Sequence, residues 1–241
     1  KGFYHLDIQA NSGDEARARC SGEIAEIITP LIKCYSSEVS LRLIAEAMQV
    51  FGGVGYTRDY PIEQYMRDSK VLTIWEGTSF MHGNDLVGRK MRMKGGIPFM
   101  NWLSLMKDFQ EKNRTAPGFE KEMKALYRAY ECVLEVKNIF DSWYENFQEK
   151  KSFIPLYALN ALFVCAQAQV AQCLVEQALI AQEKLDALTD DSYERVFYEG
   201  KIAIARYYIN QILPTAFSLT EIIKNADDTV LMCPEEVFAV R

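Results

Sequence analysis

The sequence predicts an all-α protein, and two observations carry this prediction. Glycine (13) and proline (7) make up 20 of the 241 residues, about 8%, which is below the ordinary usage of about 12%. Apolar residues also recur at helical spacing along most of the chain, as they do in helices that bury one face. A composition of 49% hydrophobic and 25% charged residues excludes a disordered chain. We therefore expect long helices joined by few turns.

The first part of the chain is expected to form three helices. Apolar spacing predicts them over residues 14–50, 61–70 and about 78–94. Pro30 should bend or restart the first helix, because proline lacks the amide hydrogen. Three glycines within residues 52–55 should end it. Thr78 or Ser79 is expected to cap the third helix, and two glycines after residue 94 should terminate it.

The second part of the chain predicts a helical bundle. Helices are expected, in chain order, over residues 98–113, 118–150, 152–188 and 191–225. The short polar breaks between them favour antiparallel neighbours, as in an up-down bundle. We therefore divide the chain into residues 1–96 and residues 97–241. Asp186, Asp190 and Asp191 cluster at a helix boundary, where we expect a solvated turn and not a metal site.

Charge and cysteine usage exclude several classes of protein. Residues 110–241 carry 14 basic and 20 acidic side chains, so the basic stripe of a nucleic-acid-binding protein is absent and no nucleic-acid partner is expected. The six cysteines are scattered without a C-x-x-C pair, which excludes zinc-site spacing. Free thiols in a reducing, cytoplasmic location are expected. No metal site is therefore expected. No membrane span is expected either, because no apolar run approaches the ~18–20 residues that a span needs.

Glu76 is the candidate catalytic residue. It follows Ile74 and Trp75 and precedes Gly77, which leaves room for a ligand beside the backbone. An apolar wall would disfavour the ionised carboxylate and raise its pKa, which suits a general base near neutral pH. In the alternative interpretation, Glu76 is not catalytic and lies in the first turn of a helix, where the positive end of the helix dipole favours its negative charge.

The glycines at 52–55 also have two interpretations. A glycine-rich turn near a helix end can admit a pyrophosphate, or it can be a helix cap and tight turn. Because the cluster follows a helix and not a strand, the dinucleotide-binding fingerprint and the P-loop are excluded.

Several motifs, in order and at matching distances, resemble the acyl-CoA dehydrogenases. Residues 45–56 (AEAMQVFGGVGY) resemble the helix-to-loop signature of that family, and residues 74–78 (IWEGT) follow with Gln49 lying 27 positions before Glu76. Residues 28–33 (ITPLIK) and 85–90 (DLVGRK) resemble the longer bacterial-type members. These members carry an extra C-terminal helical domain. The resemblance implies the family's C-terminal helical domain over residues 1–96, in part, and the added bundle over residues 97–241.

The resemblance implies an FAD-dependent oxidoreductase of fatty acid β-oxidation, which converts acyl-CoA to trans-2-enoyl-CoA. Glu76 would remove the α-proton while the β-hydride goes to the flavin, Gly77 would leave room for the thioester, and Trp75 would wall the acyl pocket. The positions that match FAD contacts are Gln49, Phe51, Gly52 and Gly53, toward a neighbouring subunit, and Thr78 and Ser79, toward their own.

The resemblance also implies partners and a longer parent chain. A homodimer or homotetramer is expected, with an electron-transfer flavoprotein as electron acceptor. Arg67 and Asp68 are expected to form a buried structural pair. Because the family's N-terminal helical and middle β domains have no counterpart here, we expect a fragment that holds FAD weakly or not at all and does not turn over.

Two competing interpretations remain open. In one, the chain is a non-catalytic assembly module whose activity is self-association. In the other, it belongs to the alkylation-response flavoproteins, which bind DNA through their C-terminal part. The net charge of residues 110–241 disfavours the second.

Overall fold

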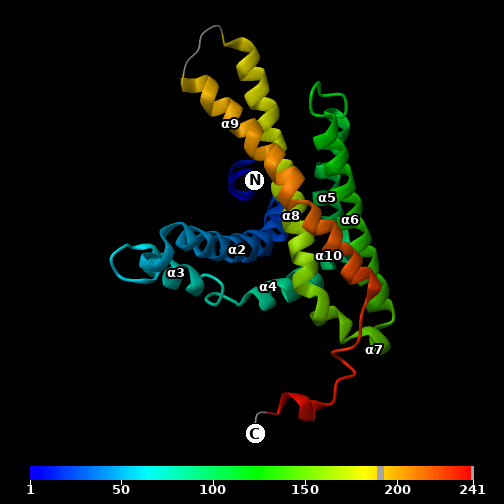
Figure 1. The fold of residues 1–241 in the computed structure, drawn as a ribbon. Coiled ribbons are helices and arrows are strands. Elements are labelled where there is room, and N and C mark those ends of the chain that lie inside the picture. Colours follow the sequence, from blue (N-terminus) through cyan, green and yellow to red (C-terminus); the bar gives the residue numbers. More distant parts are fainter. Residues whose placement is uncertain (189–192, 240–241) are drawn as a thin grey trace. The chain divides into compact units, whose positions relative to one another are not determined.

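The computed structural model describes residues 1–188 and 193–239, and every regular element in these residues is a helix. The predicted all-α class is therefore confirmed. The chain divides into two compact units, Lys1–Trp102 and Leu103–Arg241, here named unit 1 and unit 2 (Figure 1). The boundary predicted at 96/97 stays a prediction.

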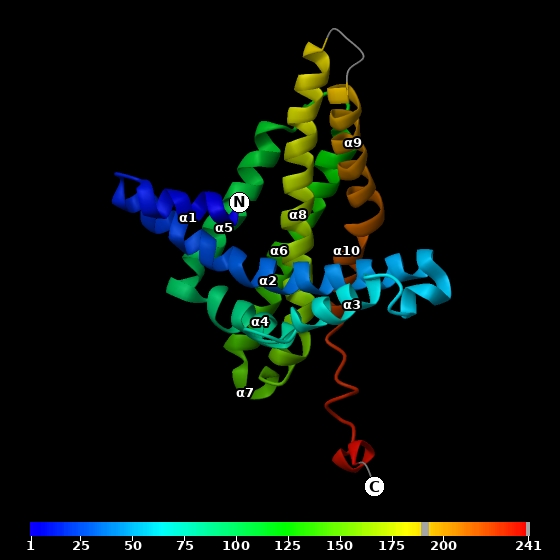
Figure 2. The same ribbon diagram turned by 90° about the vertical axis from the view of Figure 1, so that its left-hand side faces the viewer.

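Unit 1 is organised along one long helix. Its elements are α1 (Gly2–Asn11), α2 (Glu15–Phe51), η1 (Gly52–Tyr56), α3 (Ile62–Val71), α4 (Ser79–Asp85), η2 (Leu86–Lys90), η3 (Met93–Gly96) and the first residues of α5 (Ile97–Lys112). α1, α3 and α4 each contact α2, and Figure 2 shows α3 lying along α2. The core of this unit includes Ile24, Ile27, Ile28 and Leu31 of α2, all buried.

α2 is a single continuous helix. Asp14 caps it, since its Oδ1 accepts hydrogen bonds from the amides of Ala16 (2.9 Å) and Arg17 (3.1 Å). The predicted restart at Pro30 is wrong, because the helix runs through this residue without a break. Apolar side chains are buried on both sides of Pro30, and this packing outweighs one missing hydrogen bond. Gly52, with φ +62°, ends the helix as the glycine cluster predicts.

The helix predicted to reach residue 94 is interrupted. Thr78 is the N-cap residue of α4, but α4 is short and continues into the π-helical turn η2. The chain then changes direction through Lys94 (φ 51°) and Gly95 (φ 70°). In this interrupted segment, Nζ of Lys90 lies 2.6 Å from the carboxylate of Glu26 on α2. Pairing with another helix is a tertiary effect that helix propensity does not contain.

Unit 2 is a bundle of longer helices. Its elements are the rest of α5, α6 (Glu120–Glu145), α7 (Phe147–Lys150), α8 (Phe153–Ala187), α9 (Tyr193–Tyr207), η4 (Tyr208–Ile212), α10 (Pro214–Asn225) and η5 (Glu235–Phe238). α8 contacts α6, α9 and α10, and Figure 1 shows α9 running back along α8.

Two helices predicted as single segments are each divided. The helix over 118–150 breaks at Asn146, where φ is −103° and ψ is 40°. The helix over 191–225 contains the π-helical turn η4 just before Pro214, which has no amide hydrogen to continue the bonding pattern. Asp190 and Asp191 of the predicted acidic turn lie outside the described residues.

α8 is the core helix of unit 2. By length and composition it is apolar enough to cross a membrane, and it alone of the described helices meets that test, so the expectation that no stretch of the chain is long and apolar enough is wrong. However, 61% of its most apolar stretch is buried inside the structure. Alanines such as Ala158, Ala161, Ala168 and Ala171 are fully buried, which lets neighbouring helices approach closely. Packing within the bundle accounts for the apolar composition of α8.

Candidate active site

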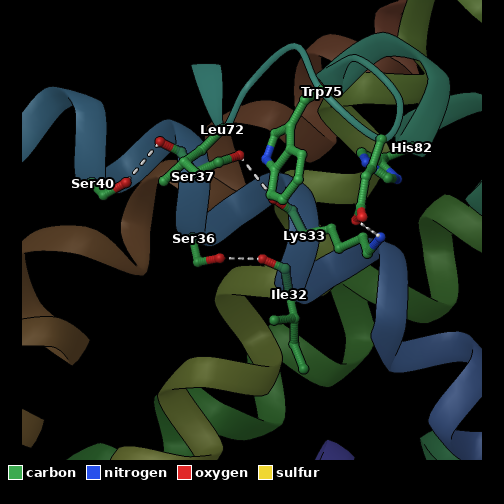
Figure 3. A pocket seen from close by; sticks show the side chains of 9 residues that line it. Ile32, Lys33, Ser36, Ser37, Ser40, Leu72, Trp75 and His82 are labelled. Carbon is green, nitrogen blue, oxygen red and sulfur yellow. Dashed lines mark hydrogen bonds and ion pairs between the residues drawn. The ribbon is translucent and has the colours of Figure 1, made fainter. Parts of the chain in front are cut away.

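A pocket of about 440 Å³ lies in unit 1 where the loop before α4 passes over α2 (Figure 3). α2 supplies one wall, and the end of α3, the loop and α4 supply the rest. The residues that line it are Ile32, Lys33, Ser36, Ser37, Ser40, Leu72, Trp75, Glu76 and His82. Of the predicted site residues, Trp75 and Glu76 therefore face one cavity.

The polar groups of the α2 wall are largely engaged within the helix. The Ser37 hydroxyl donates to the carbonyl of Lys33 (2.8 Å), and that of Ser40 donates to the carbonyl of Ser37 (3.0 Å). Ser36 bonds in the same way to the carbonyl of Ile32. Hydroxyls that bond to their own helix present fewer free donors, so this wall is less polar than its composition suggests.

The backbone at Glu76 has an uncommon conformation. Glu76 has φ 53° and Gly77 has φ 104°, so two consecutive residues adopt positive φ. A glutamate rarely occupies this region, because its Cβ crowds the backbone, whereas glycine enters it freely. Strained residues of this kind cluster at functional sites. The loop is closed by a hydrogen bond from the Ser79 amide to the carbonyl of Thr73 (3.3 Å).

The expectation of a raised pKa at Glu76 is wrong for this chain. The Glu76 side chain is 57% exposed, and its Oε2 lies 2.7 Å from Nζ of Lys33. The hydrogen bond and the charge of Lys33 lower the pKa of Glu76 below its ordinary value. Trp75 is itself more than half exposed, so within this chain the neighbouring apolar side chains do not desolvate the carboxylate.

Two titratable groups at this pocket, Lys33 and His82, were not predicted from the sequence. Burial, and next the charge of Lys33, lower the pKa of His82 below 6.5, so the imidazole is neutral at pH 7. Lys33 lies within residues 28–33, one of the motifs that resemble the family, and His82 is one of only two histidines in the sequence. Neither signal indicates that Lys33 pairs with Glu76 or that His82 lines the same pocket, because both depend on how the loop folds onto α2.

Thr78 and Ser79 lie at the start of α4. The Thr78 side chain accepts a hydrogen bond from the Met81 amide (3.4 Å), and the Ser79 hydroxyl donates to the carboxylate of Glu38 on α2. Burial raises the pKa of the neighbouring Cys34 thiol to about 11. These contacts fix the register of α4 against α2, and neither Thr78 nor Ser79 is among the residues that line the pocket.

Gln49, Phe51, Gly52 and Gly53 lie apart from the pocket, at the C-terminal end of α2. A Cβ added at Gly52 or Gly53 would meet no atom within 4 Å, so the backbone there is open on one side. The Phe51 ring is partly exposed and packs against Tyr60, with 5.1 Å between ring centroids. An open backbone beside an exposed ring fits the approach of a dinucleotide.

The expected buried pair of Arg67 and Asp68 is wrong. Both residues are exposed, and Arg67 pairs with Glu63 one turn earlier on α3 (2.9 Å). An i,i+4 pair of this kind satisfies the guanidinium locally.

In the part of the chain that the structure describes, no group of three or more histidine, cysteine, aspartate or glutamate side chains could hold a metal ion. All six cysteines are free thiols.

Two family models match the chain. One, described as "Acetyl-CoA dehydrogenase C-terminal like", matches residues 102–234. The other, described as "Acyl-CoA dehydrogenase, C-terminal domain", matches residues 12–91.

Two of the curated relatives match along nearly the whole chain, and a third matches part of it. A butyryl-CoA dehydrogenase of Syntrophomonas wolfei is 31% identical over 234 residues, covering 97% of this chain and 38% of the relative. A broad-specificity linear acyl-CoA dehydrogenase of Mycobacterium tuberculosis is 27% identical over 225 residues, covering 92% of this chain and 36% of the relative. A 3-methylmercaptopropionyl-CoA dehydrogenase of Ruegeria pomeroyi is 35% identical over 91 residues, covering 38% of this chain and 15% of the relative. The chain spans less than two fifths of the length of these relatives.

Proposed function

The chain belongs to the acyl-CoA dehydrogenase family, and we propose that it acts as part of an FAD-dependent enzyme that converts acyl-CoA to trans-2-enoyl-CoA. One observation carries the proposal. Glu76 lines a pocket of about 440 Å³ with its backbone at φ 53°, and Gly77 beside it leaves space next to the backbone. A carboxylate at a cavity wall, carried by a backbone of uncommon conformation, suits a positioned general base.

The proposed chemistry assigns one role to each loop residue. The Glu76 carboxylate is ionised at neutral pH and accepts the α-proton of the thioester. A Cβ at Gly77 would lie 3.5 Å from the ring of His82, so glycine keeps the space beside Glu76 open for the thioester group. Trp75 and Leu72 supply apolar wall for the acyl chain. Bound FAD would supply the hydride acceptor for the β-carbon.

FAD would be held by residues outside the pocket. An adenosine diphosphate group from a neighbouring subunit would approach Gln49, Phe51, Gly52 and Gly53, since the backbone at the two glycines is open. Thr78 and Ser79 would lie near the cofactor of their own subunit. A shared site of this kind requires a homodimer or homotetramer. The proposed electron acceptor is an electron-transfer flavoprotein, and free thiols suit a cytoplasmic enzyme of fatty acid β-oxidation.

The test is Glu76→Gln in a protein that carries this chain together with the remaining length of its relatives. Loss of a general base should lower turnover of butyryl-CoA and of a longer acyl-CoA by about 10²–10⁴-fold, with flavin still bound. Glu15→Gln, the same change in an exposed residue at the start of α2, should leave turnover unchanged. Full turnover in Glu76→Gln would remove Glu76 from the chemistry.

A second function, self-association, is favoured by the outer face of α9. Of the described elements other than its own continuation η4, α9 packs mainly on α8. Its opposite face exposes a stripe formed by Tyr193, Val196, Phe197, Ile204 and Tyr207. Tyr193 and Tyr207 lie seven positions before and after Gly200, and Val196 and Ile204 lie four positions before and after it. At 3.6 residues per turn these side chains share one face.

This near-symmetry suits a second copy of the chain. Two antiparallel α9 helices that cross at Gly200 would place each tyrosine opposite the other tyrosine and Val196 opposite Ile204, as an isologous two-fold contact requires. In sedimentation experiments at micromolar concentration, we expect association that Ile204→Glu abolishes. Ile222→Glu, a matched change at an exposed isoleucine of α10, should have no effect. A monomeric wild-type chain refutes this function.

A further inference from the structure

Lys33 contacts the candidate base across a large sequence separation. The two residues are 43 positions apart, on α2 and on the loop before α4, and their charged atoms lie 2.7 Å apart. Figure 3 marks this ion pair at the end of the Lys33 side chain, on the pocket side of α2. Lys33 and Glu76 both line the pocket. The charge of Lys33 therefore acts directly on the group proposed to accept a proton.

Few other charged groups face Glu76. His82 on α4 also lines the pocket, and it is neutral at pH 7 because burial and then Lys33 lower its pKa. Glu38 on α2 accepts the hydrogen bond of the Ser79 hydroxyl. The α2 serines on the wall carry no charge. Among the residues that line the pocket, Lys33 is the cation that balances the Glu76 carboxylate.

The pair contributes little to folding. Its side chains are 43% and 57% exposed, and exposed ion pairs have small effects on stability. Its effect on the carboxylate is larger, because a neighbouring ammonium group favours the ionised form. An acyl chain that fills the pocket would displace water from Glu76, and this loss of hydration would favour the protonated acid. A protonated acid cannot accept the α-proton.

We propose that Lys33 is a positioning residue for Glu76, which orients the carboxylate at the pocket wall and keeps it ionised when the pocket is filled. This role rests on the proposed function of Glu76 as the base. Lys33 itself transfers no proton in this proposal. It holds Oε2 of the carboxylate and opposes the effect of desolvation on the same group.

The first experiment measures the pKa of Glu76 in the chain itself. The chain is labelled with carboxyl-¹³C glutamate, and the Glu76 resonance is assigned by its absence in Glu76→Gln. Lys33→Met should raise the pKa of Glu76 from its lowered position toward the ordinary range of a glutamate, whereas Lys33→Arg should keep it lowered. The control is Lys94→Met, which removes another exposed lysine, one that pairs with Glu23, and should leave Glu76 unchanged.

An unchanged pKa of Glu76 in Lys33→Met would overturn the inference. In the longer protein, Lys33→Met should move the acid limb of the kcat/KM pH profile to higher pH, and Lys33→Arg should restore it. A merely structural lysine would lower activity equally at all pH values. Failure of the proposed function has a different signature, namely full turnover in Glu76→Gln, and the NMR measurement does not depend on turnover.

Discussion

Replacing Phe140 with alanine should destabilise unit 2 by about 4–5 kcal/mol. The ring is 1% exposed, and its centroid lies 4.9 Å from that of Trp143 at an interplanar angle of 55°. Removal of a buried phenylalanine side chain costs about 3–5 kcal/mol through lost apolar contact and the remaining cavity. The aromatic pair that is lost is worth about 0.5–1.5 kcal/mol, which places the expected cost in the upper part of the range for a buried phenylalanine. The folding equilibrium constant should therefore fall about a thousandfold or more.

Urea unfolding, followed by circular dichroism and by tryptophan fluorescence, measures this change. The matched control is Phe147→Ala, the same substitution at a ring that is 47% exposed. It should cost less than about 1 kcal/mol. The dependence of the unfolding free energy on urea should be similar in both variants, because the native structure is retained. Equal losses in the two variants would refute the reasoning that burial determines the cost.

Three further predictions test other parts of the chain. Asp14→Ala removes the cap of α2 and should cost about 1 kcal/mol in urea unfolding. Cys34 and Cys165 are fully buried and burial raises the pKa of each, so Ellman's reagent should reach them only after unfolding; simultaneous reaction of all six native thiols contradicts this. Burial is the main cause that lowers the pKa of His5 and of His82 below 6.5. The unfolded chain therefore binds protons first as pH falls, stability declines below about pH 6.5, and His5→Gln with His82→Gln should flatten that decline.

Local chemistry explains which parts of the fold were predictable. The end of α2 follows from the need for positive φ at Gly52, and the start of α4 follows from the capping oxygen of Thr78. The end of α2 and the start of α4 depend on neighbouring residues, so both can be predicted from the sequence. The path of α2 through Pro30 depends on burial along its length, and the ion pair of Lys90 with Glu26 depends on a helix 64 residues away. Such tertiary effects have no local signature.

The same distinction applies to the site. Glu76 was predictable because Trp75 and Gly77 flank it and because its distance from Gln49 matches a family spacing. The contact of Glu76 with Lys33 was not predictable, although Lys33 lies in the motif over residues 28–33. Whether a carboxylate is desolvated depends on what covers it, and whether it is paired depends on which helix the loop meets. The sequence therefore singled out Glu76, which lies at the wall of a pocket, but it predicted the wrong direction for its pKa; the role of Glu76 as a base stays a prediction.

The environment of Glu76 indicates how its basicity would be set during catalysis. In this chain the carboxylate is more than half exposed and paired with Lys33, which favours the ionised form and makes it a weak base. Trp75 and Ile74 are also more than half exposed beside it, so the apolar surface that would desolvate the carboxylate lies open. A surface that covers these side chains, together with a bound acyl chain, would raise the pKa of Glu76 while Lys33 opposes the rise. Two opposing effects of this kind allow a carboxylate to stay ionised near neutral pH and yet accept a proton from carbon. Ile74 and Trp75 on the loop and Lys33 on α2 therefore act on the same carboxylate. Substitution of Lys33 should move the pH dependence of the proposed reaction to higher pH, and substitution of Ile74 or Trp75 should move it to lower pH.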